Sequence, residues 1–255
     1  MSAPVFLAEP GSLDGVAVGG GYLLDGAEGH HAAVVQRRGP GEPVDVVDGA
    51  GVRVRGSVAR QTAQGVLLDV VDVVREPPAA PAFVLVQALA KGGRDELAIE
   101  TATELGVDAV VPWAAQRSVV IWRGDRAVKS QARWIAAVRT ATKQARRARV
   151  PRVEAALDTA GLAARVAAVV GAGGTAIVLH EEATTPLRDV PLPAAGAAVE
   201  VLLVVGPEGG IAPAEVEQLV AAGAVTARLG PLVLRTSTAG PAALALLSDR
   251  LGRWA

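Results

Sequence analysis

The segment VLLVVGPEGG, residues 201–210, decides the fold of this chain. Its first five residues form a continuous branched apolar run, which is typical of a β-strand covered by helices on both faces. The run ends in a turn that glycine builds most easily. Pro213, Glu215 and Gly223 then predict a helix over residues 212–222, with proline at its first position and glycine past its end. Because ligands bind at the carboxyl ends of parallel strands and at helix N-termini, this turn is the first candidate binding loop.

The chain from residue 82 onward alternates expected strands with expected helices. We expect strands at residues 83–88, 109–113, 175–179 and 201–205, and helices at residues 95–105, 127–145, 161–170 and 212–222. A last helix runs through Leu251, with Thr236 or Ser237 as its N-cap. This alternation predicts an α/β fold with a mostly parallel sheet and helices on its faces. The glycine cluster at 171–174 precedes a strand instead of following one, so we interpret it as a loop and not as a nucleotide fingerprint.

Residues 1–76 show a different pattern, in which short apolar runs alternate with turn residues. We expect strands at residues 4–7, 31–36, 43–47, 52–59 and 65–74. The segment Glu76–Pro81 is rich in proline and predicts a short, stiff linker. The chain therefore divides into a small β domain at residues 1–76, expected to be a barrel, and an α/β domain at residues 82–255.

Composition places the chain among ordinary globular proteins. Apolar residues make up 51% of its 255 residues, and the formal net charge of −1 excludes an overall basic nucleic-acid binder but leaves local patches open. The absence of cysteine excludes disulfides and thiolate zinc sites, and with three histidines we expect no metal site. No signal peptide is visible, and the longest apolar stretches are too short to span a bilayer. We therefore expect a cytoplasmic protein without a membrane segment.

The segment 126–152 carries the clearest charge asymmetry. A charge run usually marks a solvated helix face. Within this segment there is no Asp or Glu to pair with the basic side chains, so the face repels itself. In a nearly neutral chain this asymmetry favours a polyanionic partner. The segment has no acidic residue and nine basic ones: Arg126, Lys129, Arg133, Arg139, Lys143, Arg146, Arg147, Arg149 and Arg152.

Two loops carry a resemblance to a known family. The turn VVGPEGG at 204–210 and the segment LGPLVLRTSTA at 229–239 together resemble the RsmE family of SPOUT methyltransferases, which methylate N3 of one uracil in small-subunit ribosomal RNA. Residues 87–120, 143–151 and 178–184 resemble further segments of that family in the same order. The resemblance implies a SPOUT-type parallel sheet with a trefoil knot in the C-terminal domain, a small N-terminal PUA-like RNA-binding β-barrel, and a homodimer.

The resemblance also implies site residues and partners. The cofactor is expected to be S-adenosylmethionine, and the partner 16S ribosomal RNA within the small ribosomal subunit. Residues expected to bind the cofactor are Leu179, His180, Glu181, Gly206, Pro207, Glu208, Gly209, Gly210, Leu229, Gly230, Leu234, Arg235, Thr236, Ser237, Thr238 and Ala239. Residues expected to contact RNA are His31, Arg37, Lys91, Arg94, Arg117, Lys143, Gln144, Arg146 and Arg147.

Methylation of uracil N3, the reaction that the resemblance implies, requires a group that stabilises negative charge. As uracil N3 loses its proton, charge spreads onto O2 and O4, which a guanidinium can stabilise. Arg147 and Arg235 are the candidate catalytic residues, and phosphate binding or a structural loop contact is an equal alternative for each. The sequence assigns no general base. A buried arginine is a poor base, because it stays protonated.

Two other functions stay open at this point. One is another SPOUT methyltransferase that acts on a ribose 2′-OH or a transfer RNA. The other is a non-catalytic RNA-binding module that assists ribosome assembly through the β domain and the basic segment. A mere binder has no need for the glycine turn at 206–210 and the Leu-Arg-Thr segment at 234–236 together, so this pair of loops favours an enzyme.

Overall fold

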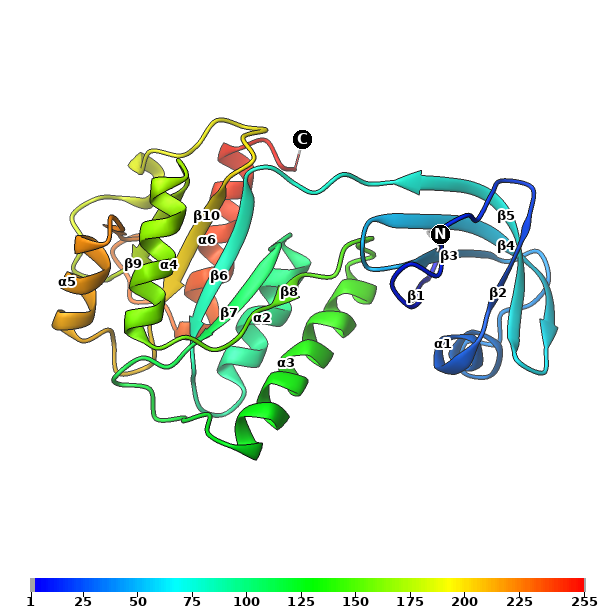
Figure 1. The fold of residues 1–255 in the computed structure, drawn as a ribbon, viewed down its shortest axis with the longest axis horizontal. Helices are drawn as coiled ribbons and strands as arrows, with labels where there is room; N and C mark the ends of the chain where they lie inside the picture. The colour runs from blue at the N-terminus through cyan, green and yellow to red at the C-terminus, as the bar shows by residue number, and fades with distance from the viewer. Residues whose placement is uncertain (1–2, 255) are drawn as a thin grey trace. The chain divides into compact units, whose positions relative to one another are not determined.

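The computed structural model of this protein describes residues 3–254, which form two compact units (Figure 1). The first unit comprises the chain up to Pro78 together with Thr142–Val150. The second comprises Ala79–Ala141 and the chain from Pro151 onward. The segment Thr142–Val150 thus lies with the first unit, whereas the sequence pattern placed it in the second domain.

The second unit is an α/β structure on a six-stranded parallel sheet with strand order β11-β9-β10-β6-β7-β8. The strands are β6 (Ala82–Ala88), β7 (Ala109–Trp113), β8 (Arg152–Val153), β9 (Thr175–Leu179), β10 (Glu200–Val205) and β11 (Val225–Ala227). The helices are α2 (Arg94–Glu104), α3 (Asp125–Gln144), α4 (Thr159–Gly171), α5 (Pro213–Ala221) and α6 (Thr236–Arg250), and η2 (Leu187–Asp189) is a 3-10 turn. The end of α3, from Thr142 to Gln144, belongs to the first unit. The parallel sheet with covering helices, predicted from the alternation, is confirmed.

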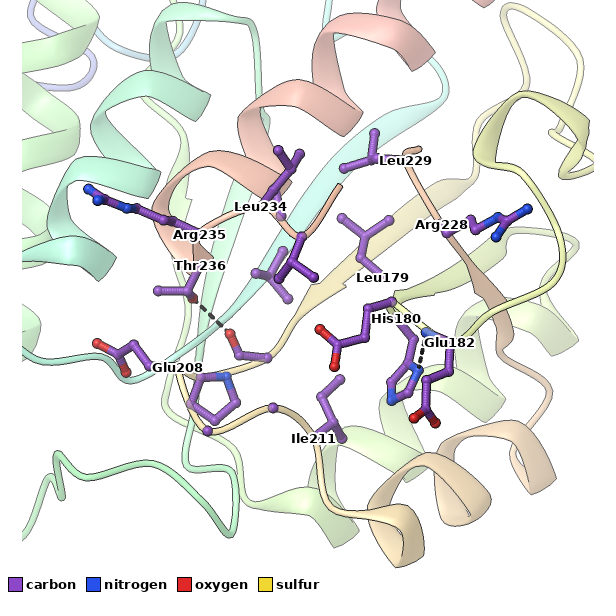
Figure 2. Close-up of a pocket in the computed structure, with 18 of the residues that line it drawn as sticks. Leu179, His180, Glu182, Glu208, Ile211, Arg228, Leu229, Leu234, Arg235 and Thr236 are labelled. Atoms are coloured by element: carbon purple, nitrogen blue, oxygen red, sulfur yellow. Dashed lines mark hydrogen bonds between the residues drawn. The ribbon is translucent and has the colours of Figure 1, made fainter. Parts of the chain in front are cut away.

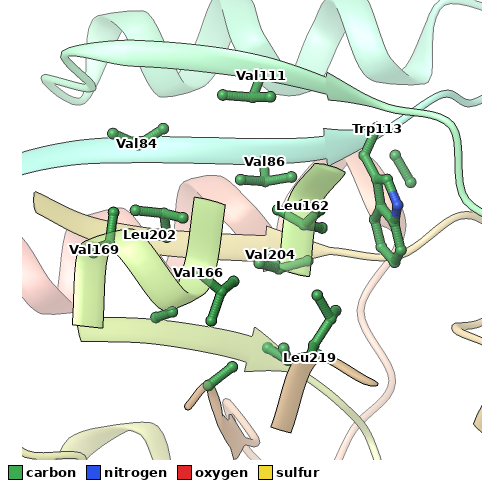
Figure 3. Packing of buried hydrophobic residues seen from close by; sticks show 14 of the residues in the cluster. Val84, Val86, Val111, Trp113, Leu162, Val166, Val169, Leu202, Val204 and Leu219 are labelled. Carbon is green, nitrogen blue, oxygen red and sulfur yellow. The ribbon is translucent and has the colours of Figure 1, made fainter. Parts of the chain in front are cut away.

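Helices cover both faces of this sheet, which explains why its central strands are apolar throughout. Under α4 and α5 lies a buried cluster that includes Val84, Val86, Val111, Leu202 and Val204 from the strands and Leu162, Val166, Val169 and Leu219 from the helices (Figure 3). On the other face, α6 packs closely at Gly240. A Cβ on Gly240 would lie 2.8 Å from Leu85 Cδ1 and 3.3 Å from Val205 Cγ2.

Short edge strands and the start of the last helix differ from the prediction. β8 and β11 were not predicted, and both lie at the edges of the sheet with two and three residues. Segments this short carry no periodic signal. The predicted N-cap of α6 at Thr236 or Ser237 is wrong, because α6 begins at Thr236 with Arg235 at the N-cap and no side-chain cap. The Thr236 hydroxyl donates to the Gly206 carbonyl oxygen instead, at 2.7 Å.

The first unit contains a five-stranded sheet with strand order β1-β3-β4-β5-β2. Its strands are β1 (Val5–Leu7), β2 (Gly21–Leu24), β3 (Pro43–Val47), β4 (Val52–Thr62) and β5 (Gly65–Arg75). β1 pairs with β3 in parallel, and the other pairs are antiparallel. Phe6, Leu13, Val46, Val54 and Leu68 belong to its buried core. β2, at one edge of the sheet, was not predicted.

The strand predicted at residues 31–36 is wrong. This stretch is the π-helical segment His31–Val35, which continues α1 (Gly26–His30). The β-branched Val34 and Val35 suggested a strand, but both side chains are exposed and so show no alternation. Packing of the helix depends on Gly29, because a Cβ there would collide with the Leu24 carbonyl.

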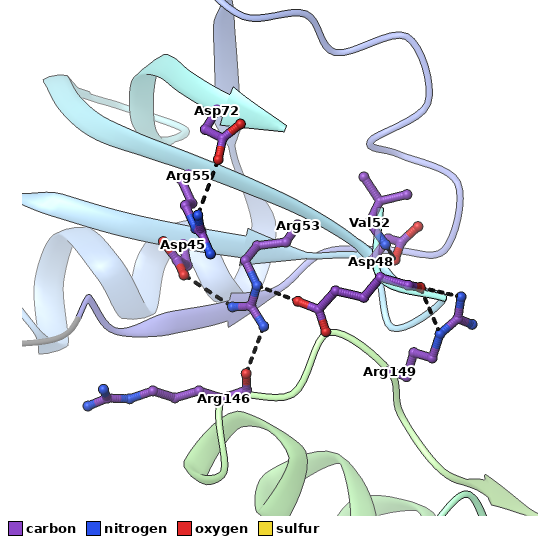
Figure 4. A network of polar contacts seen from close by, with 9 residues as sticks. Asp45, Asp48, Val52, Arg53, Arg55, Asp72, Arg146 and Arg149 are labelled. Atoms are coloured by element: carbon purple, nitrogen blue, oxygen red, sulfur yellow. Dashed lines mark hydrogen bonds and ion pairs between the residues drawn. The ribbon is translucent and has the colours of Figure 1, made fainter. Parts of the chain in front are cut away.

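Two arginines hold the segment 142–150 in the first unit (Figure 4). The buried Arg53 donates from Nε to Glu76 Oε1 at 2.8 Å, from Nη1 to Asp45 Oδ2 at 3.1 Å, and from Nη2 to the Arg146 carbonyl oxygen at 2.8 Å. Arg149 donates from Nε and Nη2 to the Glu76 carbonyl oxygen at 3.1 and 2.7 Å. The segment is therefore fixed through both its backbone and its side chains.

Within residues 3–254, none of the helices combines the length and the apolar character that crossing a membrane requires.

Candidate functional site

The candidate site lies where three neighbouring parallel strands end. The register places Leu179, the last residue of β9, beside Val205 of β10 and Ala227 of β11. All three residues line a cavity of about 760 Å³. This volume lies within the range of about 300 to 1,000 Å³ that small-molecule sites occupy. Its position matches the rule that ligands bind outside the carboxyl ends of parallel strands.

Three loops continue from these strand ends and form the cavity walls (Figure 2). Among the residues predicted to bind the cofactor, the structure brings all together at the cavity except Ser237 and Thr238. Ser237 is buried and Thr238 exposed, both in the first turn of α6. The residues that line the cavity as predicted are Leu179, His180, Glu181, Gly206, Pro207, Glu208, Gly209, Gly210, Leu229, Gly230, Leu234, Arg235, Thr236 and Ala239.

Several lining residues were not predicted as cofactor contacts. Glu182 lies in the segment 178–184, and Leu232 and Val233 lie in the segment 229–239, which the sequence analysis had already identified. Their position next to predicted residues could have identified them as cavity residues. Ala227 and Arg228 lie at the end of β11, a strand too short to predict. The remaining ones are Arg94, Arg117, Val205, Ile211 and Pro213.

The turn at 206–210 needs glycine at two positions for different reasons. A Cβ on Gly206 would lie 2.5 Å from Ile211 Cγ1, so the side chain of Ile211 occupies that space. Gly210 has a φ of +73°, in the left-handed region that side chains with a Cβ rarely adopt. Its N–H donates to the Pro207 carbonyl oxygen at 2.9 Å and closes the turn.

Glu208 in this turn is an ionised carboxylate with three donors around it. Its Oε1 accepts from Arg94 Nη1 at 2.9 Å and from the Lys91 backbone N–H at 3.3 Å. Partial burial acts to raise the pKa of Glu208. Hydrogen bonds from its own backbone N–H, the Arg94 guanidinium and the Lys91 N–H outweigh that effect, so the pKa lies below its ordinary value. Glu208 is therefore a poor proton acceptor near neutral pH.

His180 is held by the loop that follows β9. Its Nδ1 accepts a hydrogen bond from the Glu182 backbone N–H at 3.2 Å (Figure 2). A neutral ring in this arrangement carries its proton on Nε2, because the Nδ1 lone pair is in use. In a neutral His180 the free donor is therefore Nε2, and Nδ1 is occupied by the Glu182 N–H.

The buried Glu215 connects three segments near the turn through its carboxylate. Its Oε1 accepts from the Gln116 backbone N–H at 2.9 Å and from the Thr159 hydroxyl at 2.6 Å, and its Oε2 accepts from the Ala212 N–H at 3.2 Å. One carboxylate thus ties the loop after β7 and the starts of α4 and α5 together. Its predicted place in the first turn of a helix is confirmed.

The residues predicted to contact RNA fall in both units. Arg94 and Arg117 line the cavity, and Lys91 contributes its backbone N–H to Glu208. The others lie in the first unit: His31, Arg37, Lys143, Gln144, Arg146 and Arg147. Of the two candidate catalytic arginines, the structure places Arg235 in the cavity wall, whereas Arg147 is not among the lining residues.

Within the first unit, the predicted RNA contacts have different surroundings. Arg37 and Arg146 are exposed and have φ values of +53° and +54°. Gln144 is also exposed. Lys143 Nζ forms an ion pair with Glu28 at 2.7 Å, a partner that the sequence did not reveal.

His31 packs its ring edge-on against Phe6, with 6.0 Å between the ring centroids. It also shares a hydrogen bond of 3.2 Å with Gln36. The His31 ring is thus held by neighbours inside the first unit. Over the described part of the chain, no group of three or more His, Cys, Asp or Glu residues is arranged to hold a metal ion.

Comparison with known proteins assigns the family. Residues 77–248 match the family model of the RNA methyltransferase domain. The chain is 48% identical over 232 residues to the ribosomal RNA small subunit methyltransferase E of Mycobacterium tuberculosis, covering 91% of this chain and 87% of that protein. The chain belongs to the ribosomal RNA small subunit methyltransferase E family. The resemblance drawn from the two loops is thereby confirmed.

Two further members agree with this assignment. The protein of the same name from Bacillus subtilis is 31% identical over 235 residues, which cover 89% of each chain. The crystal structure of ribosomal RNA small subunit methyltransferase E from Neisseria gonorrhoeae, bound to S-adenosyl methionine, matches this structure with a TM-score of 0.82 at 25% identity over 98% of each chain. The likeness thus extends over nearly the whole chain and includes the fold.

Proposed function

We propose that this protein transfers a methyl group from S-adenosylmethionine to N3 of a uridine in 16S ribosomal RNA of the small ribosomal subunit. The protein is an S-adenosylmethionine-dependent ribosomal RNA methyltransferase. The observation that carries the proposal is the cavity at the ends of β9, β10 and β11 in a chain of this family. The choice of N3 follows from the resemblance of the two loops.

The cavity suits S-adenosylmethionine in size and in chemistry. Leu179, Leu229 and Leu234 offer apolar wall for the adenine ring (Figure 2). The Glu181 and Glu182 carboxylates line the same cavity and can accept hydrogen bonds from ribose hydroxyls or an ammonium group. When bound there, the cofactor supplies an electrophilic methyl group on a sulfonium centre. We assign the predicted cofactor residues that line the cavity to this role.

The chain itself must orient the uracil and stabilise the charge that develops on it. Arg235 is exposed in the cavity wall and stays protonated, so its guanidinium can stabilise charge on O2 and O4 as N3 loses its proton. Glu208 does not take that proton, because its pKa is lowered and Arg94 holds it. A neutral His180 does not take it at Nδ1, which already accepts from Glu182 N–H.

We assign RNA binding to the first unit, with residues 1–76 as a PUA-like barrel domain. Two exposed arginines there, Arg37 and Arg146, have left-handed backbone conformations. Such conformations cost about 1 kcal/mol or more and concentrate at functional sites. Exposed guanidinium groups suit phosphate oxygens. Arg147 belongs to this surface in the proposal, as an RNA contact or a second catalytic arginine.

We also assign a trefoil knot to residues 82–255. Its support is the close association of the loop after β9 with the end of β11. Arg228 donates its backbone N–H to the Thr185 carbonyl oxygen at 3.0 Å, and its own carbonyl oxygen accepts from Leu187 N–H at 2.8 Å. Arg250 donates to the carbonyl oxygens of Leu187 and Val190 at 3.0 Å each. A homodimer, a cytoplasmic location and the assembled small subunit as substrate complete the proposal.

Calorimetric titration with S-adenosylmethionine tests the cofactor site. Gly230 lines the cavity, and a Cβ there meets nothing within 4 Å, so Gly230→Val fills the cavity without crowding the protein. We expect the variant to bind at least about ten-fold more weakly while its thermal unfolding is unchanged. Gly171→Val is the matched control, since Gly171 also has open space but ends α4 outside the cavity lining. Absence of binding by the parent protein contradicts the cofactor assignment.

Methylation of the RNA tests the substrate. Small ribosomal subunits from a strain without this enzyme are incubated with the protein and S-adenosylmethionine, and the methylated nucleotide is mapped by mass spectrometry. N3-methyluridine in 16S RNA is the expected product. A methyl group on a ribose 2′-oxygen, or on transfer RNA alone, overturns the proposed target. Parallel incubation with naked 16S RNA shows whether the assembled particle is required.

A further inference from the structure

The turn at 206–210 is flanked by two loops that leave the same edge of the sheet. The register places Val205 beside Gln87 of β6, and Gln87 beside Pro112 of β7. The loops that follow β6 and β7 therefore emerge next to the turn. Arg94, the first residue of α2 after the β6 loop, and Arg117, in the loop after β7, both contact the turn.

The loop after β6 contacts the side chain of Glu208. Gly92 and Gly93 have φ values of +67° and +71°, a conformation that glycine adopts readily. Lys91 precedes these two glycines and Arg94 follows them. The Lys91 N–H and the Arg94 guanidinium converge on the same oxygen, Glu208 Oε1, at 3.3 and 2.9 Å. The Glu208 side chain is 21% exposed and that of Arg94 41%, so the pair is partly shielded from water.

The loop after β7 contacts the backbone of Gly209, the residue that follows Glu208 in the turn. Arg117 Nη1 donates to the Gly209 carbonyl oxygen at 3.1 Å. A Cβ on Gly209 would lie 3.4 Å from Arg117 Cβ, so the arginine side chain lies along the turn. The two arginines thus hold consecutive residues, one through a carboxylate and the other through a carbonyl.

We infer that Arg94 and Arg117 are positioning residues that hold the 206–210 turn in its cofactor-binding shape, in place of the RNA contacts that the sequence resemblance implied. A glycine-rich turn has wide conformational freedom, so bonds from outside the turn restrict its shape in addition to the internal bond from Gly210 N–H to the Pro207 carbonyl oxygen. Ordering the turn before the ligand arrives lowers the cost of binding. This inference rests on the proposed cofactor site.

The test is calorimetric titration with S-adenosylmethionine in the absence of RNA. We expect Arg94→Met and Arg117→Met each to weaken binding about three- to ten-fold, as suits a partly shielded charged hydrogen bond. Arg123→Met is the matched control, because Arg123 is exposed in the loop that also holds Arg117 and lies outside the cavity lining. Arg94→Lys keeps the charge and recovers part of the affinity. Unchanged thermal unfolding confirms that the variants are folded.

A double-mutant cycle separates positioning from direct contact. If Arg94 acts through Glu208, the double variant Arg94→Met with Glu208→Gln binds no more weakly than the weaker single variant. Additive losses indicate that Arg94 touches the cofactor directly, and they overturn the inference.

A second readout addresses the RNA alternative. RNA affinity and its salt dependence should match those of the parent in both arginine variants. Unchanged cofactor binding with weaker RNA binding, and a salt slope smaller by about one, identifies phosphate contacts and overturns the inference. A parent protein that binds no S-adenosylmethionine refutes the proposed function and the inference together. Normal binding by the parent and by all the arginine variants refutes the inference alone.

Discussion

Thr236 and Gly206 are joined by a hydrogen bond from the threonine hydroxyl to the glycine carbonyl oxygen at 2.7 Å, across 30 residues of sequence. The same hydroxyl oxygen accepts from Gln87 Nε2 at 2.8 Å. Gln87 is fully buried and Thr236 nearly so. The three residues therefore link the ends of β6 and β10 to the first residue of α6, directly beside the cavity.

The first prediction concerns this link. Thr236→Val keeps the shape of the side chain and removes the hydroxyl, so Gln87 Nε2 loses its shortest acceptor and the Gly206 carbonyl its donor. Because buried polar groups without partners are costly, we expect a loss of about 1 to 3 kcal/mol in the free energy of unfolding. Urea unfolding of parent and variant measures it, and cofactor affinity should fall as well.

Thr175→Val is the control for this change. Thr175 Oγ1 makes a long, exposed hydrogen bond of 3.4 Å to the Pro191 carbonyl oxygen, and water can replace it. We expect the control to change stability by less than about 0.5 kcal/mol. Equal effects of the two substitutions contradict the role given to the buried link.

Thr236 also shows which kind of contact could not be predicted from the sequence. Its residue type and its place before a helix favoured an N-cap, which is a local rule. The structure uses its hydroxyl for a contact 30 residues away, and no local pattern contains that information. By contrast, the apolar run at 201–205 and the turn at 206–210 were predictable, because a buried strand and a glycine turn have signatures within a few residues.

In the candidate site too, features with a local sequence signature were predicted and contacts between distant residues were not. Loops with a distinctive sequence gave most of the residues that line the cavity. The resemblance predicted Arg94 and Arg117 as RNA contacts, and it contained no sign of their hydrogen bonds to Glu208 and Gly209. The register of β6, β7 and β10 sets these contacts, and register is a property of the assembled sheet.

The second prediction concerns the packing of α6 on the sheet. Gly240→Ala improves helix propensity by about 1 kcal/mol, but overpacking in a well-packed core costs about 1 to 3 kcal/mol. The new methyl group would lie 2.8 Å from Leu85 Cδ1, and Leu85 is fully buried and has little room to move. We therefore expect net destabilisation, measured by urea unfolding.

Gly171→Ala is the opposite case and serves as the control. Gly171 is the last residue of α4, and a Cβ there meets nothing within 4 Å. The substitution should stabilise the protein by about 0.5 to 1 kcal/mol, because only the propensity term acts. Stabilisation by both substitutions shows that α6 tolerates a wider spacing from the sheet than the structure indicates.

The third prediction concerns pH and the buried Asp95. Burial raises the pKa of Asp95 above its ordinary value of 3.8, and backbone hydrogen bonds from Glu96, Ala90 and Asp95 itself oppose this only in part. The folded state then holds the proton more tightly than the unfolded state. Its contribution to stability is present below pH 3.8 and is lost as the pH rises through the raised value.

Asp95→Asn tests the direction of this pH dependence of stability, because asparagine stays neutral at every pH. The free energy of unfolding of the variant, relative to the parent, should increase as the pH rises from below 3.8 through the raised pKa, and should then level off. Urea titrations over this pH range measure the difference. Parallel profiles for the two proteins, or a difference of the opposite sign, exclude a raised pKa at Asp95.

The fourth prediction concerns the first unit and compares two arginines of β4 (Figure 4). The Arg53 side chain is 9% exposed and bonds to Asp45, Glu76 and the Arg146 carbonyl oxygen. Arg53→Met leaves two carboxylates and a carbonyl without their donor, and we expect a loss of about 3 kcal/mol. Arg55 pairs with Asp72 at 3.2 Å, and its side chain is 53% exposed. Arg55→Met should therefore cost less than about 1 kcal/mol.

Urea unfolding gives both values, and amide hydrogen exchange in β3, β4 and β5 assigns them to the first unit. The Arg53 variant should also exchange faster in the segment 142–150, because Arg53 holds the backbone at Arg146. High salt should reduce the small Arg55 effect more than the Arg53 effect, since exposed pairs are screened and buried ones are screened much less. Equal losses for the two variants, with the same salt dependence, contradict the role of Arg53 as the residue that fixes this segment.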